Sequence, residues 1–188
     1  MACLVVSIGI TFLAWAIVIS SSVPKVASIA PASSLIKDVC VGRELPIDFN
    51  LCVEILNSEP RVVSASDLTS IAIAITEAGL SKAKKTQWYV RKLQKQPGRT
   101  PDYGYVLQQC NAAYELYLVH FRNALDTVKY EDYLSAAYNL KAGYTDDINQ
   151  CRNAQSSRKV KDAVISKGNE LMLMFADVAF QTVDRLIT

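Results

Sequence analysis

The sequence predicts an all-α protein, an up-down-up-down four-helix bundle that carries an N-terminal helical hairpin and two disulfides. The first observation is composition: the 188 residues include only 7 Gly and 6 Pro, so turns are few and elements are long. The second is that apolar residues recur at alternating spacings of three and four, which is the pattern of bundle helices. The third is that four cysteines take positions that face each other in two helical hairpins.

Residues 1–22 are predicted to be a secretory signal peptide. No charged side chain precedes Lys25, and Leu4–Val18 is almost wholly apolar. The first 18 residues would rise about 27 Å as a helix, so an uncleaved membrane anchor is the alternative. The small residues that follow it favour cleavage between residues 22 and 30. Cleavage removes Cys3 and leaves an even number of cysteines in an oxidising compartment, where disulfides persist.

The remaining chain, residues 31–188, is predicted to form one domain. Residues 31–60 make the helical hairpin and residues 66–188 make the bundle, because no shift of composition after residue 60 marks a second domain. The 20 basic and 18 acidic side chains nearly cancel. This balance excludes a polybasic nucleic-acid-binding protein and an acidic disordered tail as descriptions of the whole chain.

Two consecutive antiparallel helices are predicted between residues 107 and 151, joined by the short turn Lys129–Asp132. In such a hairpin, facing residues have numbers with a constant sum, and Val128 with Tyr133 gives the same sum as Cys110 with Cys151. The register therefore predicts a Cys110–Cys151 disulfide on the buried seam. Each helix has one apolar stripe: Leu107, Cys110, Tyr114, Tyr117, Phe121, Ala124 and Val128, then Tyr133, Ala137, Leu140, Tyr144, Ile148 and Cys151.

The same argument predicts a Cys40–Cys52 disulfide near the start of the domain. These two cysteines are symmetric about Pro46, and Gly42 lies nearby. Both residues break helices, so the segment is expected to be a short helical hairpin. Closing a loop of this size stabilises the fold by roughly 3 kcal/mol in the chain-entropy model.

Two further helices complete the bundle. One is predicted to be capped by Ser66-Asp67 and to end before Pro97-Gly98. The other is predicted to follow Ser156-Ser157 and to run through Leu186. Four long helices with short connections give the up-down-up-down order.

No enzyme is predicted, and neither a metal nor a cofactor is expected. His120 is the only histidine, so multi-histidine metal sites are excluded and any catalytic triad would have to use it. It lies one position from the buried stripe, where we expect an edge-of-core or solvated side chain, with a pH-sensitive contact as the alternative. The tyrosines at helical spacing look like a ligand cage, but we expect core residues with their hydroxyls at the rim.

Two charged surfaces are candidate contact sites. The acidic pairs Glu131-Asp132 and Asp146-Asp147 lie off the buried stripe or at its edge, so we expect them to face solvent or a partner. Paired carboxylates can do acid–base chemistry, but no pocket is predicted around them. For the basic stretch 82–99, a solvated helix face is the first interpretation and a contact with an anionic polymer is the alternative. That stretch has no acid and seven cations: Lys82, Lys84, Lys85, Arg91, Lys92, Lys95 and Arg99.

Several blocks of this sequence resemble the plant invertase and pectin methylesterase inhibitors. The resemblance covers residues 31–188 and depends on four spaced cysteines in their local context. The blocks are Leu35–Cys40, Asn50–Leu56, Leu107–Cys110, Tyr114–Tyr117, Asp132-Tyr133 and Lys141–Cys151. The resemblance implies the same hairpin and disulfide-linked bundle. It also implies a secreted, non-enzymatic inhibitor that forms a one-to-one complex with a cell-wall enzyme.

This resemblance favours one target enzyme but does not determine it. Pectin methylesterase comes first, because the Pro-Lys-Phe motif associated with invertase inhibitors is absent from residues 152–159. A cell-wall or vacuolar invertase is the alternative, and a structural or ligand-carrying bundle that inhibits neither is the third. Ala142-Gly143-Tyr144 also departs from the Ser-Ala-Ala that is usual on this helix.

Inhibition by such a bundle is expected to be steric, with a rigid helix face in the cleft of the enzyme. In this family the later bundle helices cover the esterase cleft, which implies partner-binding residues between positions 131 and 150. These are Glu131, Asp132, Thr145, Asp146, Asp147 and Gln150. The implied location is the apoplast or cell wall, or the vacuole for an invertase inhibitor, and there the basic 82–99 face would meet a pectic polyanion. Contacts with nucleic acid, or with a membrane after cleavage, are not expected.

Overall fold

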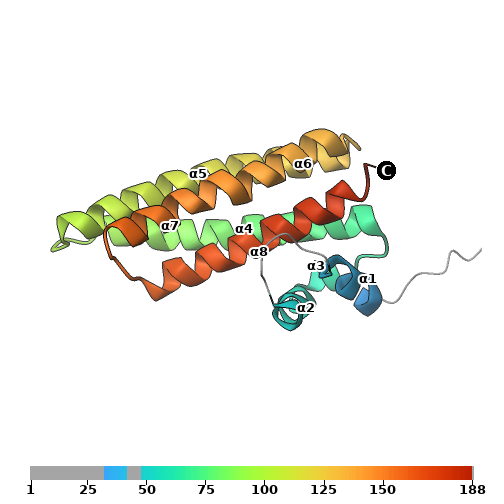
Figure 1. Cartoon of the computed structure of the whole chain (residues 1–188), viewed down its shortest axis with the longest axis horizontal. Coiled ribbons are helices and arrows are strands. Elements are labelled where there is room, and N and C mark those ends of the chain that lie inside the picture. The colour runs from blue at the N-terminus through green and yellow to red at the C-terminus, as the bar shows by residue number, and fades with distance from the viewer. Residues whose placement is uncertain (1–31, 42–47, 188) are drawn as a thin grey trace, which may run out of the picture.

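The computed structural model describes residues 32–41 and 48–187, and every regular element within these ranges is helical. The predicted leader, its cleavage site and the Gly42–Pro46 centre of the first hairpin lie outside the described residues. Figure 1 shows the long helices packed side by side as rods, with the short N-terminal helices gathered beside one part of the bundle. None of the described helices is both long and apolar enough to cross a membrane.

The N-terminal hairpin consists of α1 (Ala32–Val39), α2 (Phe49–Asn57) and the short α3 (Pro60–Val63). Cys40 and Cys52 form the predicted disulfide, with their Cα atoms 6.0 Å apart. The third helix was not predicted. It is a single turn that begins with a proline, which suits the first helical position because no backbone N–H is needed there.

Ion pairs hold this hairpin against the bundle. Arg185 near the C-terminus places Nη1 2.6 Å from Oδ2 of Asp38, and Lys82 places Nζ 2.6 Å from Oε1 of Glu59. Ile36, Val39, Leu56 and Val62 of the hairpin are buried in the same core cluster as the apolar side chains of the bundle. The hairpin therefore adds to one core rather than forming a second one.

The four rods confirm the predicted bundle. They are α4 (Leu68–Gln94), α5 (Pro101–Lys129), the continuous rod of α6 (Tyr133–Ala142), η1 (Gly143–Asp147) and α7 (Ile148–Ser157), and α8 (Ala163–Asp184). The turn between α5 and α6 spans three residues, as expected for an antiparallel hairpin.

Side-chain caps set where the helices begin. Oδ1 of Asp67 accepts from the backbone N–H of Ser70, and Oγ of Ser70 accepts from the backbone N–H of Asp67, so the predicted cap of α4 is present. The predicted start of the last helix was wrong. Ser156-Ser157 belongs to the end of α7, and α8 begins later because Asp162 accepts from two backbone N–H groups of its first turn.

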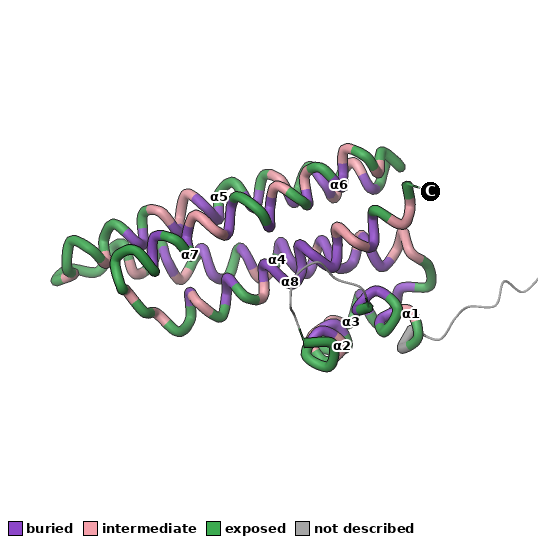
Figure 2. The backbone as a smooth tube through the Cα atoms, in the orientation of Figure 1, coloured by how far each residue is buried: buried purple, intermediate pink, exposed green. Residues whose placement is uncertain are grey.

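The apolar stripes are the core of the bundle. Every residue of the predicted α5 stripe is fully buried, from Leu107 to Val128. Figure 2 shows the buried (purple) turns of the rods facing one another and the exposed (green) turns facing outward. The 3-4 spacing therefore identified the inward face of this helix correctly.

The tyrosines divide into two groups that the sequence did not separate. Tyr114 and Tyr117 are fully buried, and their hydroxyls donate inside the core to Asn169 Oδ1 (2.7 Å) and to the backbone carbonyl of Met172 (3.0 Å). The expectation of hydroxyls at the rim is wrong for these two. Tyr130 and Tyr138, in contrast, are largely exposed and take no part in the core.

A π-helix interrupts the rod that was predicted as one α-helix. In η1 the chain is wound more loosely for five residues between α6 and α7. Gly143 begins this segment, and a Cβ atom there would lie 3.0 Å from Cε2 of Phe121. The absence of a side chain at Gly143 therefore lets the Phe121 ring lie against the backbone of η1.

At Gly168, α8 approaches α4 closely. A Cβ atom on this residue would lie 2.7 Å from Oγ1 of Thr86, which itself donates to the backbone carbonyl of Lys82 at 3.1 Å. Threonine is branched at Cβ and stiff, so it cannot move aside easily. The absence of a side chain at Gly168 thus sets the spacing of these two helices.

Gly168→Ala is expected to lower the free energy of unfolding by about 1 kcal/mol or more, because overpacking outweighs the helix propensity that alanine adds. The same substitution in a Thr86→Ala background should be neutral or stabilising, since the clashing group is gone. Urea unfolding of the four proteins, followed by circular dichroism, measures this coupling. An equal loss in both backgrounds would contradict the close contact.

Candidate protein-binding surface

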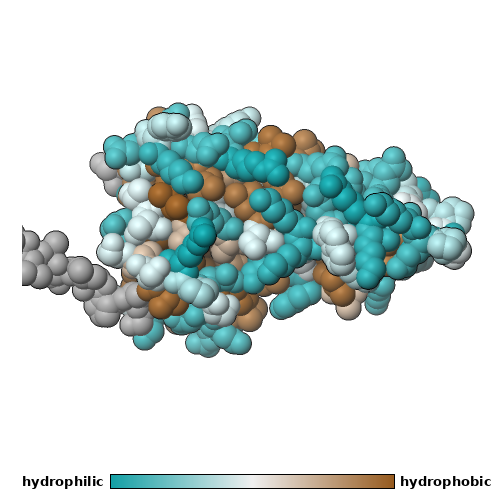
Figure 3. Space-filling model, turned by 180° about the vertical axis from the view of Figure 1, so that it is seen from behind, coloured by the Kyte–Doolittle hydropathy of each residue, from teal (hydrophilic) through white to brown (hydrophobic). Residues whose placement is uncertain are grey.

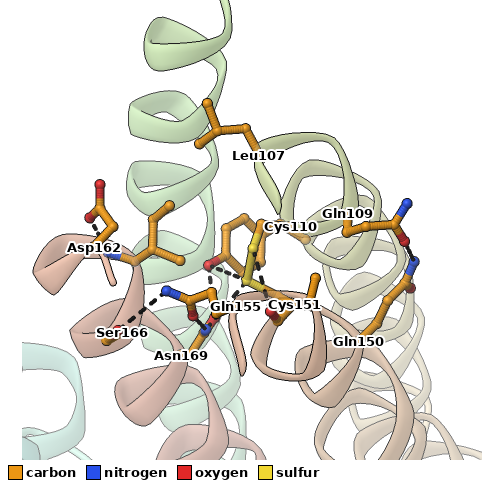
Figure 4. The surroundings of a disulfide bond; sticks show 12 residues. Leu107, Gln109, Cys110, Gln150, Cys151, Gln155, Asp162, Ser166 and Asn169 are labelled. Atoms are coloured by element: carbon orange, nitrogen blue, oxygen red, sulfur yellow. Dashed lines mark hydrogen bonds between the residues drawn. A yellow bond between two sulfur atoms is a disulfide. The ribbon is translucent and has the colours of Figure 1, made fainter. Parts of the chain in front are cut away.

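The Cys110–Cys151 disulfide joins α5 to α7, with the two Cα atoms 4.3 Å apart and both residues fully buried. Figure 4 shows polar side chains from α7 and α8 converging on it. Asn169 of α8 donates from Nδ2 to Oε1 of Gln155 (3.0 Å) and accepts from the Tyr114 hydroxyl. Burial raises the pKa of the Tyr114 hydroxyl, which keeps it a neutral donor. One buried network therefore fixes three rods relative to each other.

Gln150, a predicted partner-binding residue, lies at the outer edge of this seam. Its Nε2 donates to Oε1 of Gln109 on α5 at 3.0 Å, and Figure 4 shows the two amides meeting beside the disulfide. The residue is half-buried. Its side chain thus serves mainly to join α7 to α5.

The first predicted acidic pair lies at the turn between α5 and α6. Asp132 caps α6 by accepting from the backbone N–H of Ser135 at 3.2 Å. Hydrogen bonds from the Ser135 side chain and backbone lower the pKa of the Asp132 carboxyl. Glu131 has φ of 61°, the left-handed conformation that closes the tight turn. Both side chains are exposed, as expected.

The second acidic pair divides between surface and core. Thr145 and Asp146 are exposed on η1, and Oγ1 of Thr145 donates to the backbone carbonyl of Lys141 at 2.9 Å. Asp147 is only 3% exposed, and its Oδ2 lies 2.7 Å from Nδ1 of His120. The expectation that both aspartates face solvent or a partner is therefore wrong for Asp147, because η1 turns this side chain inward toward α5.

Burial sets the electrostatics of the His120–Asp147 pair. Loss of water raises the pKa of the Asp147 carboxyl, the contact with His120 opposes this effect, and the neighbouring Asp146 charge adds to it. Burial also raises the pKa of the Tyr117 hydroxyl, and the Asp147 charge contributes. His120 is half-buried at the edge of the core, as expected, and its partner is the buried Asp147 carboxyl on η1.

The predicted residues do not form one site. Asp132 and Asp146 are separated by fourteen positions along the rod, which corresponds to about 20 Å at the helical rise. The structure brings Thr145 and Asp146 together on the outer side of η1. Glu131 and Asp132 lie at the end of the bundle, and Asp147 faces the core.

Exposed apolar residues on α6 were missed by the sequence analysis. Leu134 is 69% exposed and Tyr138 is 75% exposed, one helical turn apart on the outer side of α6. The signal was available, because both positions lie off the buried stripe of their helix. Figure 3 shows that apolar surface gathers on the half of this view nearer the grey N-terminal segment, whereas the far end is mostly hydrophilic.

Exposed apolar and acidic side chains share the outer side of the rod formed by α6 and η1. The described residues contain no cluster of three or more histidine, cysteine or acidic side chains that could hold a metal ion. The ring nitrogen Nδ1 of His120 is engaged by Asp147, and the exposed side chains around η1 lie on an outer helix face. A rigid helical face with apolar and acidic groups suits contact with another protein.

The fold and this surface define a class of protein, a disulfide-linked four-helix bundle with an N-terminal helical hairpin. Residues 34–181 match the family model described as plant invertase/pectin methylesterase inhibitor, so the chain belongs to this family. The resemblance inferred from the cysteine-containing blocks is thereby confirmed. Members of the family are inhibitors rather than catalysts.

Two solved structures show the same fold. The crystal structure of mutant form A of a pectin methylesterase inhibitor from Arabidopsis superposes with a TM-score of 0.69 at 14% sequence identity. The crystal structure of a pectin methylesterase inhibitor from Arabidopsis thaliana gives a TM-score of 0.61 at 15% identity. Each comparison covers 82% of this chain and 97% of the other. A search of the curated proteins found no match.

Asp147→Asn is expected to be more stable than the wild type at neutral pH, because the buried carboxylate is costly when ionised. The raised pKa means that the folded protein binds a proton on the Asp147 carboxyl more tightly than the unfolded chain does. The stability that comes from protonated Asp147 is fully present when the pH is below 3.8, the ordinary pKa of an aspartate. It is lost as the pH rises through the raised pKa of the folded protein. The difference between the two proteins should therefore shrink toward zero below about pH 4.

Thermal unfolding of both proteins between about pH 3 and about pH 8 measures this difference. Asp146→Asn, at the exposed neighbouring position, is the matched control and should stay within about 0.5 kcal/mol of the wild type throughout. A less stable Asp147→Asn protein at neutral pH would show instead that His120 stabilises the ionised carboxylate.

Proposed function

We propose that this chain is a secreted inhibitor of a pectin methylesterase and blocks the active-site cleft of the enzyme in a one-to-one complex. Membership of the inhibitor family supports the class of activity. The absence of Pro-Lys-Phe from residues 152–159 favours the esterase over an invertase. The predicted leader and the two disulfides favour secretion into the apoplast, since disulfides persist in oxidising compartments.

The surface proposed to enter the cleft is the outer side of α6 and η1, called here the α6 face. It consists of Leu134, Tyr138, Thr145 and Asp146, with Glu131 at its end. Because these side chains stand on a continuous rod held to α5 by a disulfide, they lose little conformational freedom on binding. The face therefore offers a preorganised surface rather than a loop that must be ordered.

The exposure of Leu134 and Tyr138 is the observation that carries this proposal. Large apolar side chains one turn apart on an outer helix face are typical anchors of a protein interface, and tyrosine is enriched among such anchors. The carboxylates at Glu131 and Asp146 supply charge near the anchors, which steers association with a cationic cleft rim. Asp147 contributes indirectly, because its buried contact with His120 holds η1 against α5.

Tyr138→Ala is expected to weaken inhibition of a susceptible pectin methylesterase by about 30-fold, as for a hot-spot aromatic residue. Asp146→Asn should act mainly on the association rate and its dependence on salt, because exposed charges steer encounter more than they hold the complex. Titration of the oxidised, secreted protein against the esterase, at several salt concentrations, measures both effects.

Trp88→Ala is the matched control, since Trp88 is an exposed aromatic residue of α4 outside the α6 face. It should leave inhibition unchanged. Equal losses in Tyr138→Ala and Trp88→Ala would contradict the assignment of the face. Potent inhibition of an invertase, with several esterase isoforms untouched, would overturn the choice of target.

A further inference from the structure

The near-neutral net charge of the chain conceals two halves of opposite sign. Residues 82–115 and 149–170 contain twelve Lys and Arg against four Asp and Glu, whereas the other described residues contain six against thirteen. The basic segments lie at one end of the bundle (Figure 1), since Tyr89 of α4 contacts Asp162 at the start of α8, and Arg158 pairs with Asp102 at the start of α5. This basic end is opposite the end that carries α6.

One exposed stripe of α4 concentrates the basic charge. The chain has no carboxylate between Glu77 and Asp102. Within this stretch Lys82 forms an ion pair with Glu59, and Arg91 forms one with Glu115. The remaining exposed lysines and Trp88 share one side of the helix over about 16 Å, and we call them the basic stripe: Lys84, Lys85, Trp88, Lys92 and Lys95. Among the described residues, none of the four lysines lies within ion-pair distance of a carboxylate.

Trp88 lies at the centre of the basic stripe and is 65% exposed. A tryptophan ring left in water on a helix of 27 residues, otherwise lysine-rich on that side, is an unusual use of a large apolar side chain. Lys92 places its Nζ 5.4 Å from the ring centroid, a cation–π contact that keeps the ring beside positive charge. The stripe therefore combines a flat apolar platform with flanking cations.

We propose that the basic stripe binds a polyuronate chain, with a sugar ring stacked on Trp88 and neighbouring carboxylates paired with the lysines. A polymer that repeats a sugar ring and a carboxylate matches this alternation of apolar and cationic groups. The four cations of the basic stripe are lysines, which act as point charges. Recognition of phosphates in a nucleic acid favours the bidentate guanidinium of arginine instead.

The choice of polymer rests on the proposed function. A pectin methylesterase hydrolyses methyl esters of pectin and leaves free carboxylates, so the polyuronate is the product of the target enzyme. A stripe that binds this product would hold the inhibitor where the esterase has already acted. The stripe and the α6 face stand on different rods, so both contacts can be made at once.

Binding of the oxidised, secreted protein to polygalacturonate, with no esterase present, tests this proposal. The triple variant Lys84→Gln/Lys92→Gln/Lys95→Gln is expected to weaken binding by about tenfold and to reduce its salt dependence. Trp88→Ala should weaken it as well. The matched control is Lys37→Gln/Arg122→Gln/Lys129→Gln, which removes three exposed cations of the acidic half and should change affinity by less than about twofold.

Several results would overturn the proposal. They are the absence of binding by the wild type at low salt, an equal loss in the control variant, equal binding to fully methyl-esterified pectin, and tighter binding to RNA or to anionic vesicles. Esterase inhibition, assayed separately with a small soluble ester, is expected to be unchanged in the stripe variants. If the wild type inhibits no esterase but the polygalacturonate results hold, the proposed function fails and the binding site does not.

Discussion

The covalent link between Cys110 and Cys151 fixes the register on which the rest of the bundle depends. It closes a loop of 41 residues, which in the chain-entropy model stabilises the fold by about 4 kcal/mol. With α5 and α7 locked at this level, Asn169 of α8 can reach both Gln155 and the Tyr114 hydroxyl. A polar cluster of this kind tolerates burial only when its partners are satisfied together. The disulfide and the amide network therefore specify one arrangement of three rods.

The features that could be predicted from the sequence are those set by a repeating pattern. The apolar residues of the α5 stripe all indicate the same buried face, so one ambiguous position does not alter the prediction of that face. The two disulfides followed from the same regularity, because antiparallel hairpins with short turns have a fixed register. The cap at Asp67 was also predictable, since its contact with Ser70 is local in sequence.

The features that were missed depend on tertiary contacts at single positions. The π-helix begins where Gly143 meets the Phe121 ring, a contact between two helices that cannot be seen in the local sequence. In the π-helix, the Asp147 side chain points inward to His120. Asp146 and Asp147 looked equivalent in the sequence, but the first is exposed and the second is buried. Before α8, both Ser156-Ser157 and Asp162 are possible N-cap residues. The hydroxyls of Tyr89 and Tyr103 donate to Asp162, and these tertiary contacts favour the later start at Asp162.

The distribution of charge explains how two contacts of opposite sign can coexist on so small a protein. Screening at physiological salt limits electrostatic influence to roughly 8 Å, whereas α5 alone, with 29 residues, is roughly 43 Å long. The acidic end and the basic stripe are therefore electrically independent, and the net charge of +2 describes neither. Each of the two proposed contacts would therefore meet a surface of its own sign. A four-helix rod is suited to this separation, because its length exceeds the screening distance while its rigidity keeps the two faces apart.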